Sequence, residues 1–414
     1  MPKVDLLIFN VGTAVTFSSR PVARESQVIV KEDFEIAVKD GKIVALGQRG
    51  SLRGSYEAAR VIDACGRLVT PGLVDMHTHA VFAGSRDDEL ELRLRGTPYS
   101  EILRKGGGIF RTVRATRSST DDELLRALLS RLETMLSLGA TAVEVKSGYG
   151  LELEAEERLL RIINRAAALS KVTVVPTLLA HVPPEWASSG DERARYVRSF
   201  AQGLVTRASS SGLARFVDVF CDEGAFTPEE SRIILSSARQ RGLGVRIHAD
   251  QFSRLGCTKV AAEVGAASAD HLEVSDQSSV RELAAGGVMA GLLPASYLAT
   301  FSGSRPPVAL LREADVPMAL GTDLSANSVM PSMQTALDLA IYLYGLTPQE
   351  ALAAATVNSA FSLGLVDRGT LDTDMVADLV IWDLERPSQL GYEWGRDRAL
   401  MVVRGGDVVK APAP

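Results

Sequence analysis

The sequence predicts a (β/α)8 barrel of the TIM type and a small β-sandwich domain that is formed from both termini. Eight apolar runs of strand length recur through the middle of the chain, and helix signals lie between most of them. This alternation is typical of parallel strands joined by helical crossovers. The two ends of the chain are instead rich in β-forming residues and turn signals. A doubly wound parallel sheet is the alternative fold for the middle region.

The two ends are expected to fold together as one discontinuous domain, residues 1–66 with residues 366–414. The first segment contains the β-rich runs VDLLIFNVGTAVTF, FEIAVKDGKIVALG and RVIDACGRLVTPG, and KDGK is a hairpin turn signal. The second segment resumes this composition in ADLVIWDLE and ALMVVRGGDVV. Residues 67–365 are therefore assigned to the barrel.

The barrel strands are predicted in GLVDMHTHA, ATAVEVKSGYG, VTVVPTLLAH, RFVDVFCDE, GVRIHADQF, AASADHLE, GVMAGLLP and VPMALGTD. Several helices between them begin with clear capping signals. Thr120 and Glu123 form a capping box before an apolar pattern that ends at Gly139. The same Thr-x-x-Glu pattern, with proline as the first helical residue, recurs at Thr227 and Thr347.

The composition is that of an ordinary globular protein. The 414 residues are 46% hydrophobic and 23% charged, with a formal net charge of −6, which gives no reason to expect nucleic acid as a partner. No apolar run reaches the roughly 18 residues of a membrane span, and the first residues lack a signal-peptide pattern. A small-molecule substrate is therefore the expected partner, with no membrane, and a homodimer is left open.

The three cysteines, Cys65, Cys221 and Cys257, lie far apart in the sequence. They form no C-x-x-C motif and no disulfide framework, so each is expected to be a small buried apolar residue. The reducing cytoplasm is the compartment expected on these grounds.

All five histidines fall at the C-terminal ends of predicted barrel strands: His77 and His79 on the first, His181 on the third, His248 on the fifth and His271 on the sixth. Asp323 ends the eighth strand. These ends meet on one face of a barrel, where active sites lie. The two histidines of H-x-H also share one side of their strand, because side chains alternate. The distribution predicts a metal site rather than scattered packing histidines.

His77, His79, His248 and Asp323 would suit one divalent ion. Three imidazoles and a carboxylate favour zinc or iron (Zn²⁺, Fe²⁺ or Fe³⁺) over magnesium or calcium, which prefer oxygen ligands. The ion would lower the pKa of a bound water to about 7. Asp323 would take the proton of that water, and His271 would polarise the carbonyl group under attack.

This pattern resembles the amidohydrolase superfamily, and across nearly the whole chain it is more specifically similar to the imidazolonepropionase family. The similar stretches are HTHAVFAGSRDDELELRLRG, GGGIFRTV, EVKSGYGL, VPTLLAHVPPEW, DVFCDEGAFT, IHADQFSRLG, SADHLE and ALGTD. Of these, EVKSGYG and HADQ are specific to that family. The resemblance implies hydrolysis of the ring amide of 4-imidazolone-5-propionate to N-formimidoyl-L-glutamate in histidine degradation, and it makes the same four residues the metal ligands.

The resemblance also implies substrate contacts. Arg86 would pair with the propionate carboxylate, which a guanidinium can hold with two parallel hydrogen bonds. The alternative is a solvated arginine bonded to Asp87 or Asp88. Tyr149 and His181 would line the pocket for the ring and its tail.

Two features depart from the patterns of related proteins. Lys146 lies on the second strand, whereas the carboxylated lysine that bridges two metals in related amidohydrolases comes from the fourth, so one metal is expected. After the aspartate of the eighth strand the family usually continues Cys-Asn-Pro-Gly followed by Ser or Thr, but here the loop reads DLSANSVMPSM. Ser325 replaces Asn, Asn327 replaces Gly and Ser328 keeps a hydroxyl. These three are expected to bind substrate, so the change bears on which ring is preferred.

Gln251 distinguishes the expected cyclic amide hydrolase from a deaminase of the same superfamily. A deaminase of the superfamily usually carries a glutamate three residues after the fifth-strand histidine, and glutamine cannot shuttle a proton. Gln251 is instead expected to hydrogen-bond the substrate or its water beside the catalytic Asp323 and His271. A hydrolase of a related carboxylated cyclic amide is a further alternative. A barrel without catalysis would show eroded ligands, and none is eroded here.

Overall fold

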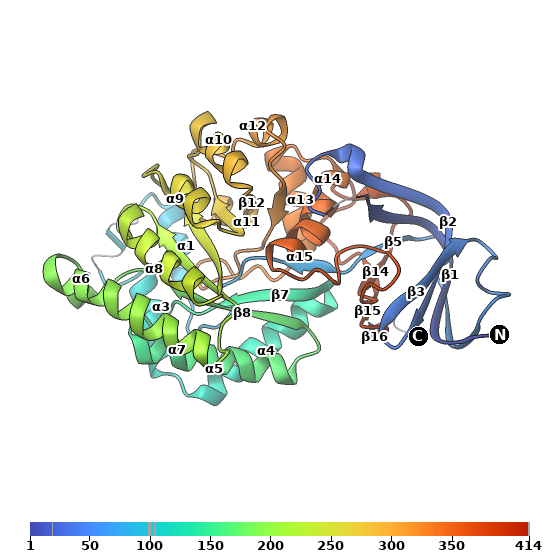
Figure 1. Cartoon of the computed structure of the whole chain (residues 1–414), viewed down its shortest axis with the longest axis horizontal. Coiled ribbons are helices and arrows are strands. Elements are labelled where there is room, and N and C mark those ends of the chain that lie inside the picture. The colour runs from blue at the N-terminus through green and yellow to red at the C-terminus, as the bar shows by residue number, and fades with distance from the viewer. Residues whose placement is uncertain (19, 98–100, 103–104, 413–414) are drawn as a thin grey trace.

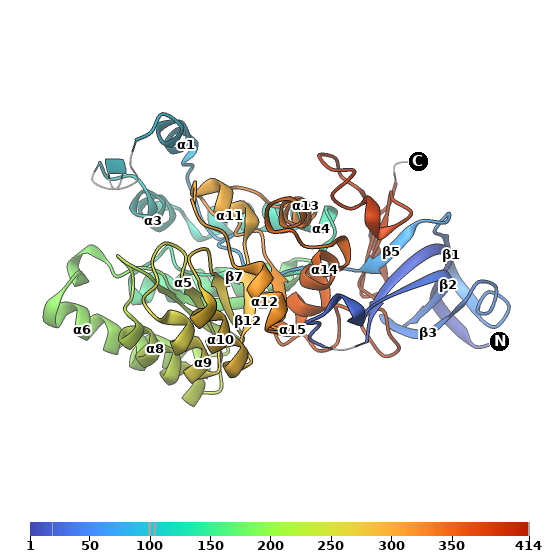
Figure 2. The same cartoon turned by 90° about the horizontal axis from the view of Figure 1, so that it is seen from above.

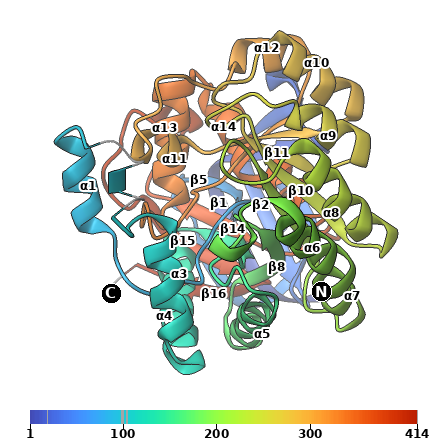
Figure 3. The same ribbon diagram turned by 90° about the vertical axis from the view of Figure 1, so that its left-hand side faces the viewer.

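The computed structural model describes residues 1–412 except 19, 98–100 and 103–104. Eight parallel strands form one sheet in the order of the sequence. They are β6 (Leu73–Asp75), β7 (Ala140–Lys146), β8 (Thr173–Ala180), β9 (Phe216–Cys221), β10 (Gly244–Ala249), β11 (Ser268–His271), β12 (Met289–Leu292) and β13 (Met318–Leu320). Figure 3 shows the helices arranged around the strands of this sheet.

Backbone hydrogen bonds close the sheet between the segments that follow its first and last strands. The N–H of Asp323 donates to the carbonyl of His77 at 3.0 Å, and the N–H of His79 donates to the carbonyl of Leu324 at 2.8 Å. The predicted (β/α)8 barrel is therefore confirmed. Its closure places the H-x-H motif directly beside the aspartate of the eighth strand.

Helices cover the outside of the barrel, and α1 and α3 stand out to one side of it in Figure 2. The helices are α1 (Asp87–Leu94), α3 (Ile109–Ser118), α4 (Asp121–Ser137), α5 (Leu153–Leu169), α6 (Gly190–Ser199), α7 (Val205–Ser210), α8 (Pro228–Gln240), α9 (Cys257–Val264), α10 (Gln277–Gly286), α11 (Pro294–Ala299), α12 (Val308–Glu313), α13 (Met333–Tyr344), α14 (Pro348–Ala353) and α15 (Ser359–Ser362).

The three predicted capping boxes are confirmed at Thr120, Thr227 and Thr347. Each threonine side chain accepts a hydrogen bond from the backbone N–H of the glutamate three residues later. These bonds satisfy N–H groups that the start of a helix leaves without partners. The sequence pattern after Thr347 predicts one continuous α-helix. The structure instead has a π-helical stretch (Ala354–Asn358) that joins α14 to α15.

Both ends of the chain build a second sheet beside the barrel (Figure 1). Its strands run in the order β16-β15-β14-β5-β1-β2-β3, and β4 pairs with β1. They are β1 (Lys3–Phe17), β2 (Val28–Lys39), β3 (Lys42–Gln48), β4 (Glu57–Asp63), β5 (Leu68–Pro71), β14 (Leu379–Trp382), β15 (Ala399–Arg404) and β16 (Asp407–Lys410). Antiparallel pairing of β5 with β14, with Val69 opposite Ile381, joins the two ends as expected. The limits 1–66, 67–365 and 366–414 stay predictions.

Cys221 and Cys257 form a disulfide, with their Cα atoms 6.0 Å apart. The prediction of no disulfide was therefore wrong. Cys221 ends β9, and Cys257 begins α9, the helix that follows β10. Because β9 and β10 are parallel neighbours, both cysteines lie at the same end of the barrel. Both cysteines are buried as predicted, whereas Cys65 is exposed, against the prediction. A lack of disulfides thus no longer supports the expected compartment.

Among the described residues, no helix has the length and apolar composition needed to cross a bilayer.

Candidate metal centre and active site

Side-chain atoms of the four predicted metal ligands converge at the C-terminal end of the barrel. The Nε2 atoms of His77 and His79 lie 3.3 Å apart, and those of His79 and His248 lie 3.4 Å apart. Asp323 Oδ1 lies 3.3 Å from His79 Nε2 and 3.7 Å from His77 Nε2. All four residues are buried. The fold therefore brings together the whole predicted set.

The spacing and protonation of these groups fit one small ion. Nitrogen atoms about 2.0–2.1 Å from a tetrahedral zinc ion lie roughly 3.3–3.4 Å from one another. Burial lowers the pKa of His77 well below its ordinary value and lowers that of His248 to about 4, so both imidazoles are neutral at neutral pH. Burial alone would raise the pKa of Asp323, but His79 and His77 hold it well below its usual range. Neutral imidazoles at His77 and His248 and an ionised carboxylate at Asp323 suit a divalent metal.

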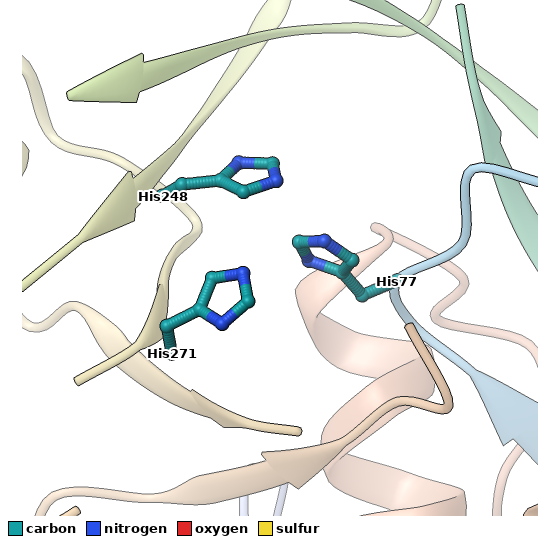
Figure 4. A group of neighbouring side chains, drawn as sticks. All are labelled: His77, His248 and His271. Carbon is teal, nitrogen blue, oxygen red and sulfur yellow. The ribbon is translucent and has the colours of Figure 1, made fainter. Parts of the chain in front are cut away.

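His271 approaches the same place from the end of β11, as Figure 4 shows with His77 and His248. Its ring centroid lies 5.5 Å from that of His77 and 5.2 Å from that of His248, and these three histidines could also share an ion. Burial lowers the pKa of His271, but Glu273, whose Oε1 lies 3.6 Å from Nδ1, raises it above its ordinary value overall. A readily protonated imidazole suits the predicted contact with the substrate carbonyl better than metal ligation.

Tyr149 and His181 lie against the metal ligands. The His181 ring stacks on His79 with centroids 5.2 Å apart, and the Tyr149 ring lies 5.5 Å from that of His181. Burial holds the pKa of His181 well below its ordinary value, so the neutral ring can donate from Nδ1 to the carbonyl of Gly148 at 3.1 Å. Both predicted pocket residues therefore border the site.

Gln251 lies in the loop after β10, which Asp222 holds in place. Asp222 Oδ2 accepts hydrogen bonds from the N–H groups of Gln251 at 3.2 Å and Phe252 at 2.9 Å. The Gln251 side chain is buried, and its Nε2 lies 3.5 Å from Ser296 Oγ, at the outer limit of a hydrogen bond. A better acceptor on a substrate could replace that contact.

The altered loop after Asp323 forms a tight turn. The N–H of Ser325 donates to the carbonyl of Ser328 at 3.0 Å, and the reverse bond measures 3.2 Å. Asn327 Oδ1 is buried and has no hydrogen-bond partner within the described part of the chain. A buried amide oxygen without a donor is costly, so a donor from a bound molecule would stabilise it. The turn therefore offers polar groups of its own in place of the usual family residues.

Arg86 immediately precedes α1. Its Nε donates to Glu89 Oε2 at 2.8 Å, and both side chains are buried. This burial and this ion pair differ from the solvated arginine, bonded to Asp87 or Asp88, of the alternative interpretation. Its contact with a substrate carboxylate stays a prediction.

Beneath the ligand histidines lies a layer of buried charged side chains that sequence reasoning missed. This charged layer consists of Glu144, Lys146, Asp218, Arg246 and Asp270, all fully buried. His248 Nδ1 lies 3.2 Å from Asp218 Oδ1, and His77 Nδ1 lies 2.7 Å from Asp270 Oδ2. Because an ionised carboxylate only accepts, each Nδ1 carries the proton and each Nε2 presents its lone pair to an ion.

A sequence signal for this layer existed. Arg246 lies two residues before His248, and Glu144 lies two before Lys146, so each pair shares one side of its strand. Barrel interiors are mostly filled by valine, isoleucine and leucine. Charged residues at inward positions of otherwise apolar strands therefore indicate side chains that hold a site.

Comparison with known proteins agrees with this geometry. The model of the amidohydrolase family matches residues 93–410. An imidazolonepropionase from Pyrobaculum arsenaticum is 42% identical over 405 residues, covering 98% of this chain and 100% of that protein. Another from Caulobacter vibrioides is 44% identical over 368 residues, covering 86% of this chain and 91% of that protein.

Solved structures show the same fold at lower identity. An adenosine deaminase from Xanthomonas campestris with bound zinc has a TM-score of 0.72 and 22% identity, covering 99% of this chain and 94% of that one. A 5-methylcytosine deaminase from Klebsiella pneumoniae has a TM-score of 0.74 and 21% identity, covering 99% and 98%. Identity this low shows the fold alone, whereas the family match and the relatives above 40% identity show more. The chain belongs to the amidohydrolase family and, within it, to the imidazolonepropionase family.

Proposed function

We propose that this chain hydrolyses the ring amide of 4-imidazolone-5-propionate and yields N-formimidoyl-L-glutamate in histidine degradation. The proposal rests mainly on the relatives named imidazolonepropionase, which align with nearly the whole chain. The aligned chain also brings the four predicted ligand side chains together. The substrate is a small molecule. The cytoplasmic location and a homodimer stay predictions.

One Zn²⁺ or iron ion per chain would be held by His77, His79, His248 and Asp323. When bound, the metal supplies a Lewis acid that lowers the pKa of a water to about 7. The contacts of Lys146 support a single ion, because its Nζ lies 2.7 Å from Glu144 Oε1 and 2.7 Å from Asp218 Oδ2. Both contacts engage it as an ammonium ion rather than as a carboxylated bridge.

Residues of this chain would then move the protons. Asp323 is ionised and borders the ligand nitrogens, so it can accept the proton of the attacking water and return it to the ring nitrogen as the amide C–N bond breaks. His271, with its raised pKa, would donate a hydrogen bond to the carbonyl oxygen as negative charge develops there. Gln251 would hydrogen-bond the ring without exchanging protons.

Binding of the substrate would use the groups around this centre. Tyr149 and His181 border His79 and would flank the ring. Arg86 would hold the propionate carboxylate, sharing its guanidinium with Glu89. The turn at Ser325, Asn327 and Ser328 would supply further polar contacts.

A hydrolase of a related carboxylated cyclic amide is the second candidate, and the altered turn after Asp323 favours it. Assays of the metal-loaded protein on imidazolone-propionate, on cyclic amides with and without a carboxylate tail, and on amino-heterocycles would separate the candidates. The proposal expects imidazolone-propionate to give the highest kcat/KM. Preference for another carboxylated cyclic amide would keep the chemistry and replace the substrate.

A further inference from the structure

We infer that Lys146 is a positioning residue for the metal ligand His248 and acts on it through Asp218. The charged layer as a whole holds the ligand-bearing segments of the barrel in place. This inference rests on the metal site of the proposed function and adds to it the residues that orient the ligands.

Lys146 is held by two acids inside the barrel. It ends β7, and its Nζ makes contacts of 2.7 Å with both Glu144 and Asp218. Burial lowers the pKa of this lysine, but the two carboxylates outweigh burial and raise it overall, so the ammonium stays charged. A buried charge is stable only with such partners. The two acids and the lysine therefore depend on one another for their positions.

Each acid of the charged layer fixes one part of the metal site. Asp218 accepts the Nδ1–H of His248 on β10, and Asp270 accepts the Nδ1–H of His77, which follows β6. Glu144 Oε2 accepts the backbone N–H of Thr78, the residue between the two histidines of H-x-H, at 3.2 Å. Lys146 therefore reaches a ligand side chain through Asp218, whereas Glu144 contacts only backbone next to the ligands and keeps Arg246 as a second cation.

Two cations hold these three acids. Arg246 Nη2 lies 3.0 Å from Asp270 Oδ2, and its Nε lies 3.9 Å from Glu144 Oε1. Lys146 joins Glu144 to Asp218. Without the lysine, three buried carboxylates face one guanidinium, and Asp218 loses the cation that holds it. Asp218 would then orient His248 poorly, and the affinity for metal would fall.

The test compares metal binding in Lys146→Met, Asp218→Asn and the double variant. Affinity for Zn²⁺ is measured by competition with a chromogenic chelator, and ligand geometry by the visible absorption spectrum of the Co²⁺-loaded protein. Loss of a residue that orients a ligand typically weakens metal affinity by about 10- to 100-fold. We expect each single variant to lose affinity in this range and to change the Co²⁺ spectrum.

The double variant tests the route. If Lys146 acts through Asp218, the double variant binds Zn²⁺ about as weakly as Asp218→Asn alone, because Asp218→Asn already removes the carboxylate through which the lysine orients His248. It also lacks both charges of the pair, so it should fold even if Lys146→Met does not. Losses that multiply in the double variant would overturn the inference, and so would failure of both lysine variants to fold.

A matched control comes from a buried ion pair elsewhere in the chain. Arg398 donates to both carboxylate oxygens of Asp338, at 3.0 and 2.8 Å. Arg398→Met should lower thermal stability and leave Zn²⁺ affinity unchanged. Wild-type affinity and spectrum in Lys146→Met would refute the positioning role. These readouts need no substrate, so inactivity on imidazolone-propionate would contradict the proposed function and leave this inference standing.

Discussion

The disulfide between Cys221 and Cys257 gives a stability prediction whose size follows from its place in the chain. It closes a loop of 36 residues that contains β10 and the loop carrying Gln251. Chain-entropy arguments give about 4 kcal/mol of stabilisation for a loop of this length. An unfolding entropy of about 2.1 cal/mol/K per residue then converts this into a Tm difference of roughly 4–5 °C for 414 residues.

Scanning calorimetry of the wild type, Cys257→Ser and Cys65→Ser, with and without reductant, measures this difference. Cys257→Ser and the reduced wild type should both melt roughly 4–5 °C below the oxidised wild type. The reduced wild type keeps every side chain, so it separates the cross-link from packing effects. Cys65 is exposed and outside the disulfide, so Cys65→Ser should melt like the wild type. Three thiols titrating in the denatured, unreduced wild type, or equal melting of oxidised and reduced protein, would refute the reasoning.

Three further predictions concern the site. The wild type should bind about one metal ion per chain, and His248→Ala should lose most of this metal and most of the activity. Metal analysis that finds two ions per chain in the wild type, or full metal content in His248→Ala, would contradict the single site. Arg86→Met should lower kcat/KM at least about tenfold with metal content intact, because a charge-assisted hydrogen bond contributes roughly 1.5–3 kcal/mol, and an unchanged kcat/KM would remove Arg86 from substrate binding. The metal-free chain should lose stability as pH falls from about 6.5 to about 4, since the unfolded chain binds a proton that the folded His248, with its pKa lowered to about 4, excludes. For one histidine this is on the order of 3 kcal/mol, so urea unfolding should depend less on pH in His248→Ala than in the wild type.

The barrel and its ligands could be predicted because their signals are local and periodic. Strand runs and capping boxes mark each element, and the histidines stand at strand ends that a barrel must bring together. The strand order of a barrel alone therefore predicts that His77, His79, His248 and Asp323 lie near one another.

The disulfide and the charged layer could not be read in the same way. The disulfide depends on how far β9 and β10 extend before the chain turns. The number of residues between Cys221 and Cys257 does not reveal this extension. The position of Lys146 in the sequence indicates only that it is not a bridging lysine, because its partner Asp218 lies on a strand that is not its immediate neighbour in the barrel. Contacts across a barrel interior depend on strand register, which periodicity alone leaves open.

Hydrolysis of imidazolone-propionate in ¹⁸O-labelled water by the metal-loaded protein tests the central claim most directly. Loss of the ultraviolet absorbance of the ring follows the reaction, and mass spectrometry identifies the product. Attack of water on the ring carbonyl predicts N-formimidoyl-L-glutamate with one ¹⁸O in the carboxylate that the carbonyl becomes. An intact imidazolone, together with release of ammonia from a purine or pyrimidine by the same preparation, would contradict the account.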